Sequence, residues 1–374
     1  MGTGGAEVLT LEVLSRLDRR AFRAEVLCLR EPGTLGGEVA ARGVPLEVLG
    51  RRGRYDPTTL PRLVRRFAHG GPDVVLTMTE HAPVFFGRLA ARLARRPATV
   101  VAMHAFGEEE RLPRWMMGTM FLSDALVLIA PAQARILEQE QGLGRRPWRR
   151  APLAYIRNGI PVGPPPGPDA RARGRGLLGL GDSDLVIGTV AGFRPVKGHD
   201  VLLRAAAELA TGAPRLRIVL VGSGPLEEAL VRLAGELGLA DRVVFAGRRR
   251  DVHDILPAFD LKCLPSRFEA YPLAVMEAMA AGLPVVACDR GGLPEMVSDG
   301  EEGLLFRAGD HLALAACLRR LLCDPALRAR MGAAARRRAE REFDIRTTVV
   351  RYEALFRTLA GRGSAPSAAQ AAAR

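Results

Sequence analysis

Residues 185–222 read LVIGTVAGFRPVKGHDVLLRAAAELATGAPRLRIVLVG and set the rhythm of the second half of the chain. LVIGTVAG and RIVLVG are short apolar runs typical of buried strands, and HDVLLRAAAELA between them has the pattern of an amphipathic helix. Short strands that alternate with helices of about ten to fifteen residues indicate βαβ units with parallel strands. The stretch therefore predicts a doubly wound α/β domain.

The same alternation continues along the rest of the chain, in two series. Between them, residues 158–176 are rich in Pro, Gly and charge, which predicts a linker. We therefore expect two Rossmann-like domains that face a cleft. The predicted bounds are an N-terminal domain at 1–160, a linker at 161–176, a C-terminal domain at 177–343, a helix at 344–360 that packs back toward the N-terminal domain, and a disordered tail at 361–374. The other strand-like runs are VVLTM (74–78), TVVAM (99–103), DALVLIA (124–130), RVVFAG (242–247), DLKCLP (260–265) and PVVAC (284–288).

The N-terminal domain departs from the usual pattern at its start. A doubly wound domain normally begins with a strand that leads into its first glycine-rich turn. Here the chain opens directly on the turn, MGTGGAEV (1–8). We expect the first, central strand of this domain to be missing and the natural start to lie upstream. An upstream reading frame that encodes no short apolar strand would contradict this expectation.

The composition is that of an ordinary globular protein, with 48% hydrophobic and 25% charged residues. No run reaches the roughly 18 uncharged apolar residues of a membrane helix, and no signal peptide opens the chain. The five cysteines show no C-x-x-C spacing, which favours reduced, buried thiols and a cytoplasmic protein.

The chain is basic, with a formal net charge of +13. Of its 54 Lys and Arg residues only Lys197 and Lys262 are lysines, so an individual arginine carries little information and each lysine carries more. A basic balance suits nucleic acid, anionic lipid or phosphorylated substrates alike. We exclude nucleic acid as a partner because no nucleic-acid motif accompanies the charge.

Residues 266–286, SRFEAYPLAVMEAMAAGLPVV, place two carboxylates in apolar surroundings. Glu277 sits in the middle of a run with the composition of a packed helix, and Glu269 precedes it in the adjoining loop. A buried carboxylate without a partner costs several kcal/mol. Both side chains therefore call for a ligand.

Proline is favoured at the first helical position, so Pro272 is expected to open the helix that contains Glu277. The amides of Leu273 and Ala274 would then be unsatisfied donors at a positive helix end, which is an anion site. Carboxylates on both sides of it suit the paired hydroxyls of sugars. A sugar on each side of a phosphate is a nucleotide sugar.

The Glu-x7-Glu pair, with PS before it and EAMAAGLPVVA and GGLPEMVSDGEEGLL after it, closely resembles the signature of glycosyltransferase family 4. That resemblance covers about residues 4–357 and implies a retaining enzyme with the GT-B fold. It implies that the N-terminal domain binds the acceptor and the C-terminal domain the nucleotide sugar. It also implies that Glu277 binds the ribose and that Glu269 faces the transferred sugar. The other matching pieces are GGAE (4–7), NGI (158–160), GTVAGFRPVKGHD (188–200), LVGSGPLEE (220–228) and VVFAGRR (243–249).

The resemblance implies a cationic pair for the diphosphate at the turn RPVKG. Lys197 holds the lysine position, whereas the usual arginine position holds Gly192, and we assign its role to Arg194 two residues later. Fixed cations there would stabilise the leaving diphosphate. Lys262 has no such context and is expected to be a solvated residue at a strand edge.

Further donor contacts are expected at glycine-rich turns. LVGSGPLEE lacks the third glycine of a dinucleotide fingerprint, so a nicotinamide site is not expected. For Gly4 and Gly5 a purely structural tight turn is the alternative. His104, directly after TVVAM, is assigned to the catalytic residues by the resemblance, and a packed or surface histidine is its alternative. The predicted donor-binding residues are Gly4, Gly5, Gly222, Gly224, Arg248, Ala270, Tyr271, Pro272, Leu273, Ala274 and Glu277.

One short sequence resembles a metal-binding motif. DSD, residues 182–184, matches the Asp-x-Asp motif of the other large glycosyltransferase fold, but it lies in a polar turn at the amino end of a predicted strand, away from the ligand edge. We expect no metal and no cofactor other than the nucleotide sugar as co-substrate.

Two segments bear on the acceptor. GRLAARLARR (87–96) is basic and amphipathic, and RRPWRR (145–150) places a Trp between arginine pairs. Both suit peripheral contact with an anionic membrane and an acceptor glycan or lipid-linked sugar. The alternative for the first is a core-facing helix.

We therefore predict a retaining, metal-independent glycosyltransferase of polysaccharide, lipopolysaccharide or glycolipid synthesis. Its expected catalytic residues are Glu269, Lys197, Arg194 and His104, and domain closure would exclude water. The alternatives are a GT-B-fold sugar-nucleotide epimerase or phosphorylase, and a non-catalytic nucleotide-sugar-binding protein. The donor sugar, its base, the acceptor and the linkage stay open.

Overall fold

The computed structural model describes residues 5–53, 56–78, 81–95, 97–103, 119–139 and 152–361. The chain forms two compact units. Unit 1 is drawn from residues 1–159 and 345–374, and unit 2 consists of residues 160–344. Four predicted features lie outside the described residues: His104, Gly4, RRPWRR and the tail beyond Gly361.

Unit 2 is built on a sheet of six parallel strands in the order β12-β11-β10-β7-β8-β9. The chain first builds outward from β7 to β9 and then returns to place β10 on the other side of β7. In open α/β sheets, ligands bind beyond the carboxyl ends of the strands at such a reversal. The strands are β7 (Leu185–Val190), β8 (Leu216–Val221), β9 (Val243–Gly247), β10 (Leu261–Leu264), β11 (Val285–Cys288) and β12 (Gly303–Phe306).

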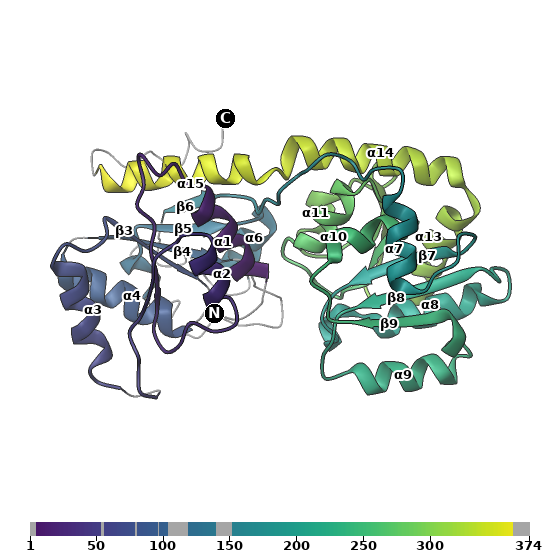
Figure 1. The fold of residues 1–374 in the computed structure, drawn as a ribbon, viewed down its shortest axis with the longest axis horizontal. Coiled ribbons are helices and arrows are strands. Elements are labelled where there is room, and N and C mark those ends of the chain that lie inside the picture. Colours follow the sequence, from purple (N-terminus) through teal and green to yellow (C-terminus); the bar gives the residue numbers. More distant parts are fainter. Residues whose placement is uncertain are drawn as a thin grey trace. The chain divides into compact units, whose positions relative to one another are not determined.

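Helices cover both faces of this sheet, as its continuous apolar strands require. A buried cluster joins α7, α10 and α11 to Val186 and Val219 of the sheet, and Figure 1 shows these helices above β8 and β9, with α9 below. The helices are α7 (Ala170–Leu178), α8 (His199–Ala210), α9 (Glu227–Glu236), α10 (Val252–Ile255), α11 (Leu273–Ala280), α12 (Leu293–Met296), α13 (His311–Cys323) and α14 (Pro325–Glu342), with short 3-10 turns η3 (Pro195–Lys197), η4 (Ala240–Arg242) and η5 (Leu256–Ala258).

The predicted linker at 161–176 is too long, because its second half is helical. Residues 170–178 form α7, which packs on α10 and η5 within unit 2. Arg175 is only 2% exposed and donates to the carbonyl oxygens of Asp182 (2.6 Å) and Asp184 (2.9 Å). The Pro, Gly and charge content predicted a linker, but these carbonyl oxygens accept hydrogen bonds from both terminal nitrogens of a buried guanidinium.

Unit 1 contains two parallel sheets, with the orders β1-β2 and β3-β4-β5-β6. The strands are β1 (Val26–Cys28), β2 (Leu46–Val48), β3 (Val74–Met78), β4 (Ala98–Met103), β5 (Ala125–Leu128) and β6 (Leu153–Tyr155). The helices are α1 (Gly5–Arg16), α2 (Gly36–Ala41), α3 (Thr59–Ala68), α4 (His81–Ala94), η1 (Met120–Leu122), α6 (Pro131–Gln139) and α15 (Ile345–Ala360).

The two sheets of unit 1 are not joined by a strand in the described residues. In the usual doubly wound order, the first strand lies between the second and the fourth, which correspond here to β1 and β3. The first described element is α1, and Leu27 of β1 and Val75 of β3 instead meet through one apolar cluster with α3 and α4. The central strand that was predicted to be missing is thus absent from the described part of unit 1.

The C-terminal helix α15 packs on α1 and β3. Its Phe356 meets Phe22 edge to face, with 6.3 Å between ring centroids, and the hydroxyl of Thr348 donates to the carbonyl of Arg157 at 3.0 Å. Among the described residues, none of the helices has the length and apolar character needed to cross a membrane.

Candidate functional site

The turn after β7 and the loop after β10 are joined at the carboxyl end of the sheet of unit 2. The amide of Arg267 donates to the carbonyl of Val196 at 2.7 Å. Gly198 has a φ of +63°, and a Cβ there would lie 2.1 Å from the carbonyl oxygen of Pro265. Only glycine fits both demands at low cost, so Gly198 allows the two loops to meet.

This junction brings Lys197 and Glu269 into an ion pair. The Lys197 ammonium lies 2.7 Å from Oε1 of Glu269, and the hydroxyl of Ser266 donates to the same oxygen at 2.6 Å. Glu269 is only 7% exposed. In the described part of the chain, its Oε2 accepts no hydrogen bond, which leaves this oxygen available to a ligand.

The start of α11 lies directly after this pair. Pro272 is the N-cap residue, with extended backbone, rather than the first helical residue that was predicted, and α11 begins at Leu273. Among the described residues no side chain caps this end. The amides of Leu273 and Ala274 thus stand at an uncapped, positive helix terminus, which suits an anion.

Glu277 lies one turn further along α11 and is half-buried. Burial raises the pKa of Glu277, and the positive charges of Lys262 and His253 partly oppose this shift. The signature glutamates therefore differ in environment, because Glu269 is ion-paired and Glu277 is desolvated.

Lys262 is not the solvated residue at a strand edge that was predicted. It is fully buried in β10, an interior strand, because β10 pairs with both β11 and β7. Burial lowers the pKa of Lys262 to about 7, against the opposing charge of Glu277. Nearby, burial and the charges of Lys262 and Lys197 together lower the pKa of His199 to about 4, so this histidine is neutral at pH 7.

The glycines of the turn after β8 meet the turn after β7. A Cβ on Gly222 would lie 2.1 Å from the carbonyl oxygen of Ala191, and one on Gly224 would lie 2.6 Å from that of Phe193. Crowding between these turns therefore accounts for both glycines, and their contact with a donor stays a prediction.

Two further glycines support the site, and the sequence reasoning gave them no role. A Cβ on Gly291 would lie 2.0 Å from the carbonyl oxygen of Glu269, and one on Gly292 would lie 1.8 Å from that of Ala270. The amide of Gly292 also donates to the carbonyl of Glu269 at 2.8 Å. The Gly-Gly pair after β11 was the available signal, since adjacent glycines often mark a close backbone approach.

Replacing Gly292 by alanine is expected to lower the free energy of unfolding by about 1 to 3 kcal/mol, because the new methyl group overpacks the loop at Ala270. Urea unfolding measures this change. The matched control is Gly235→Ala in α9, where a Cβ meets nothing within 4 Å; it is expected to stabilise by about 1 kcal/mol. Equal effects of the two substitutions would contradict the packing role of Gly292.

The remaining predicted site residues of unit 2 fall at the same edge of its sheet. Arg194 lies in the turn before η3 and Arg248 directly follows β9, and both are exposed. Ala270 and Tyr271 lie between Glu269 and α11, where Tyr271 is buried edge to face against Phe343. In unit 1, Gly5 is the exposed first residue of α1.

The DSD string lies at the opposite edge, in the turn before β7. Asp184 accepts from the amide of Gly181 at 2.8 Å and lies 3.6 Å from Arg217. Its carboxylate is therefore engaged in the turn, as its polar sequence indicated.

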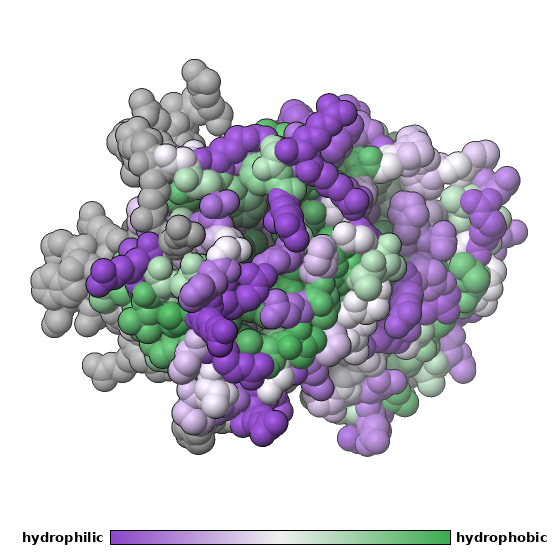
Figure 2. All heavy atoms as spheres, turned by 60° about the vertical axis from the view of Figure 1, so that its left-hand side comes forward, coloured by the Kyte–Doolittle hydropathy of each residue, from purple (hydrophilic) through white to green (hydrophobic). Residues whose placement is uncertain are grey.

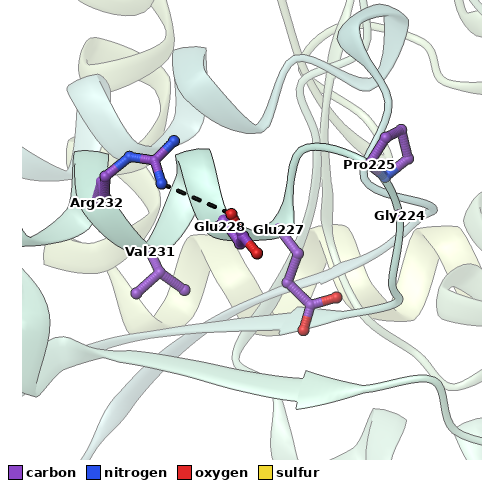
Figure 3. Close-up of a pocket in the computed structure, with 6 residues that line it drawn as sticks. All are labelled: Gly224, Pro225, Glu227, Glu228, Val231 and Arg232. Carbon is purple, nitrogen blue, oxygen red and sulfur yellow. Dashed lines mark ion pairs between the residues drawn. The ribbon is translucent and has the colours of Figure 1, made fainter.

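A cavity of about 710 Å³ opens beside Gly224 at the start of α9. Glu227 and Glu228 line it, and Figure 3 shows Glu228 turned toward Arg232, 3.8 Å away. Two carboxylates against one exposed arginine disfavour a diphosphate.

The segment GRLAARLARR falls largely in α4, which is a core helix. Arg88 is 1% exposed and donates to the carbonyl and the hydroxyl of Thr119, both at 3.0 Å, while Ala90 and Ala91 are buried. Leu93 alone of its apolar residues is largely exposed, at 55%. Figure 2 shows hydrophilic and apolar side chains intermixed on one face of the molecule. Peripheral membrane contact stays a prediction without support from α4.

Two family models match the chain. The one described as glycosyl transferases group 1 matches residues 175–338, and the one for glycosyltransferase family 4 matches residues 3–163. EpsF of Bacillus subtilis, described as a glycosyltransferase, is 29% identical over 300 residues that cover 77% of each chain. A GDP-mannose-dependent phosphatidylinositol monomannoside mannosyltransferase of Mycolicibacterium smegmatis is 38% identical over 214 residues, and the match spans 54% of either protein.

Solved structures share the fold over nearly the whole chain. HepE of Anabaena, crystallised with UDP, superposes with a TM-score of 0.82 at 23% identity and covers 95% of this chain and 96% of its own. Sucrose-phosphate synthase of Thermosynechococcus elongatus superposes with a TM-score of 0.77 at 21% identity. The superposition covers 96% of this chain and 94% of the synthase chain. The predicted GT-B fold of two Rossmann-like domains is thereby confirmed. With its Glu-x7-Glu pair at the start of α11 and family models matching both units, the chain belongs to glycosyltransferase family 4.

Proposed function

We propose that this glycosyltransferase moves a sugar from a nucleoside diphosphate sugar to an acceptor hydroxyl, with retention of configuration and without a metal ion. The observation that carries the proposal is the Lys197–Glu269 ion pair in front of the uncapped start of α11. A diphosphate at this point meets a cation on one side and a helix terminus on the other. The carboxylates on either side then suit two sugars.

Each residue has a distinct role in this proposal. Glu277 accepts hydrogen bonds from the ribose hydroxyls, and the amides of Leu273 and Ala274 bind the diphosphate. Lys197, with Arg194 reaching from the same turn, holds the diphosphate from the opposite side. Oε2 of Glu269 accepts from a hydroxyl of the transferred sugar, while Oε1 stays with Lys197 and Ser266.

In the reaction, the bond from the anomeric carbon to the diphosphate oxygen breaks as the acceptor oxygen bonds to the same face of that carbon. The acceptor proton passes to the departing diphosphate oxygen. Negative charge grows on the diphosphate, and Lys197 stabilises it. Two donors already hold Oε1 of Glu269, which favours a binding role for this carboxylate over nucleophilic attack.

Retention and metal independence are tested together. The wild-type chain is titrated with UDP and GDP, then incubated with UDP- and GDP-sugars and candidate glycan or lipid-linked acceptors, with and without EDTA. We expect one of the two nucleotides to bind. We expect NMR to show a product that keeps the anomeric configuration of the donor sugar, and the rates of transfer with and without EDTA to be equal. Inverted product or a rate abolished by EDTA contradicts the mechanism, and donor binding without turnover on any acceptor favours the non-catalytic alternative.

The acceptor is proposed to be a glycan or a lipid-linked sugar of polysaccharide, lipopolysaccharide or glycolipid synthesis. The net charge of +13 supports an anionic acceptor. The Mycolicibacterium relative is named for a phosphatidylinositol glycolipid acceptor, which supports the same class here.

A further inference from the structure

Lys262 places an ammonium group in the protein interior, where a charge is costly to bury. It lies in β10, the third of the six strands of unit 2, and is 0% exposed. In the part of the chain that the structure describes, no group hydrogen-bonds its ammonium. A lone buried ammonium opposes folding, so a compensating role must explain it.

The register of the sheet shows which face this side chain occupies. Lys262 stands opposite Gly188 of β7, and residues paired across neighbouring strands share a face. A Cβ on Gly188 would meet the ring of Phe259, which packs with Ala278 of α11. Lys262 therefore lies on the face that α11 covers, the helix that carries Glu277.

The charged and titratable groups around Lys262 come from every element nearby. Glu277 of α11 acts on it most strongly, followed by Cys263 of β10 itself, Glu269 of the preceding loop and Lys197 of η3, and Lys262 in turn acts on His199 of α8. Burial is the largest effect on both Lys262 and Glu277, and each charge opposes the burial of the other. The two groups are thus electrostatic partners, although no direct ion pair joins them among the described residues.

Building on the proposed function, we propose that Lys262 is a positioning residue of the donor site, whose ammonium keeps the Glu277 carboxylate ionised to accept hydrogen bonds from both ribose hydroxyls. A protonated carboxyl would lose part of its capacity to accept these bonds. Either lysine or arginine could supply this positive charge, and the lysine ammonium is the more compact of the two. Its presence in a chain that otherwise uses arginine, apart from Lys197, fits this confined site.

The test is a double-mutant cycle on nucleotide affinity, measured by calorimetry with UDP and GDP. Lys262→Met is expected to weaken binding of the nucleotide that the wild type binds by about tenfold. In a Glu277→Gln background, the same substitution is expected to have no further effect. Because loss of the Lys262 charge raises the pKa of Glu277 further, the loss of affinity in K262M is expected to shrink as the pH rises and Glu277 ionises in both proteins. Leu264→Met, on the same strand and face, controls for repacking.

Thermal unfolding separates this role from a structural one. The pKa of Lys262 in the folded protein is about 7, below its ordinary value of 10.5. Burial of the charged ammonium therefore destabilises the folded protein by its full amount below pH 7, and this destabilisation disappears as the pH rises toward 10.5. K262M is therefore expected to have a higher Tm than the wild type at pH 7, with a difference that narrows toward pH 10.

The outcomes are distinct. Additive losses of affinity in the cycle, unchanged affinity of K262M, or a lower Tm of K262M at pH 7 overturn the inference and leave the donor site intact. If the wild type binds neither UDP nor GDP, the proposed function fails, and this inference fails with it.

Discussion

Replacing Lys197 by methionine is expected to lower kcat by about 100- to 1000-fold, the usual cost of removing one group that stabilises developing negative charge. Methionine is unbranched and of similar length, and it lacks both the charge and the N–H donors of lysine. Lys197 is the cation that pairs with Glu269 at 2.7 Å beside the start of α11. Its loss deprives the leaving diphosphate of this charge and leaves a carboxylate that is 7% exposed without its ionic partner.

Two further variants make this result specific. Arg204→Met removes the same charge from an exposed position of α8, away from the loop at Glu269, and is expected to leave kcat unchanged. Lys197→Arg keeps the charge with a different geometry, so its kcat is expected to fall between those of the wild type and K197M. Rates are measured at saturating donor, with circular dichroism as a check on folding. Equal kcat values for K197M and the wild type would remove Lys197 from the mechanism.

The parts of the fold that were predicted correctly are those governed by local pattern. The strands of unit 2 are short apolar runs because both faces of a parallel sheet are buried, and LVIGTVAG could hardly be anything else. The roles of Lys197 and Glu269 were expected from the resemblance to glycosyltransferase family 4, and both residues lie in loops at the carboxyl ends of strands, where topology gathers ligand contacts. Patterns of this kind are visible in the residues themselves.

The errors at Lys262, expected in solvent, and at Arg175, expected in a linker, have a different cause, because the partners of both residues lie outside the short run in which each stands. Lys262 was assigned to solvent because one charge in DLKCLP says nothing about how many strands flank it. Arg175 and Arg88 stood in arginine-rich runs, yet carbonyl oxygens from a following turn and from Thr119 accept hydrogen bonds from them inside the protein. Burial of a charge depends on partners that local sequence does not reveal.

The close backbone approach at Gly291 and Gly292 could be predicted only in part from the sequence. The doubled glycine was visible, but the Glu269 and Ala270 carbonyls that require it arrive from 20 or so residues earlier in the chain, across β11. A glycine pair shows that a backbone comes close without identifying which one. The structure supplies that identity, and with it the link between the Gly-Gly turn and the loop that holds Glu269.

Replacing Glu277 by glutamine is expected to raise the Kd for UDP or GDP, whichever the wild type binds, by about 10- to 100-fold, since hydrogen bonds to a charged acceptor contribute about 1.5 to 3 kcal/mol. Glutamine preserves the shape of the side chain, so the helix keeps its packing. Glu228→Gln in α9, whose side chain is 93% exposed, is the matched control and is expected to leave Kd unchanged.

The pH dependence of binding provides the decisive signature. Burial raises the pKa of Glu277 above its ordinary value of 4.5, so this carboxylate takes up a proton at a higher pH than a solvated glutamate does. Wild-type affinity is therefore expected to decline as the pH falls, beginning above 4.5, whereas E277Q has no proton to gain and lacks this decline. Calorimetric titrations of both proteins between pH 5 and 7 measure the difference. Parallel pH profiles would mean that a group other than Glu277 binds the ribose, because only a titrating ligand contact can make the two curves converge at low pH.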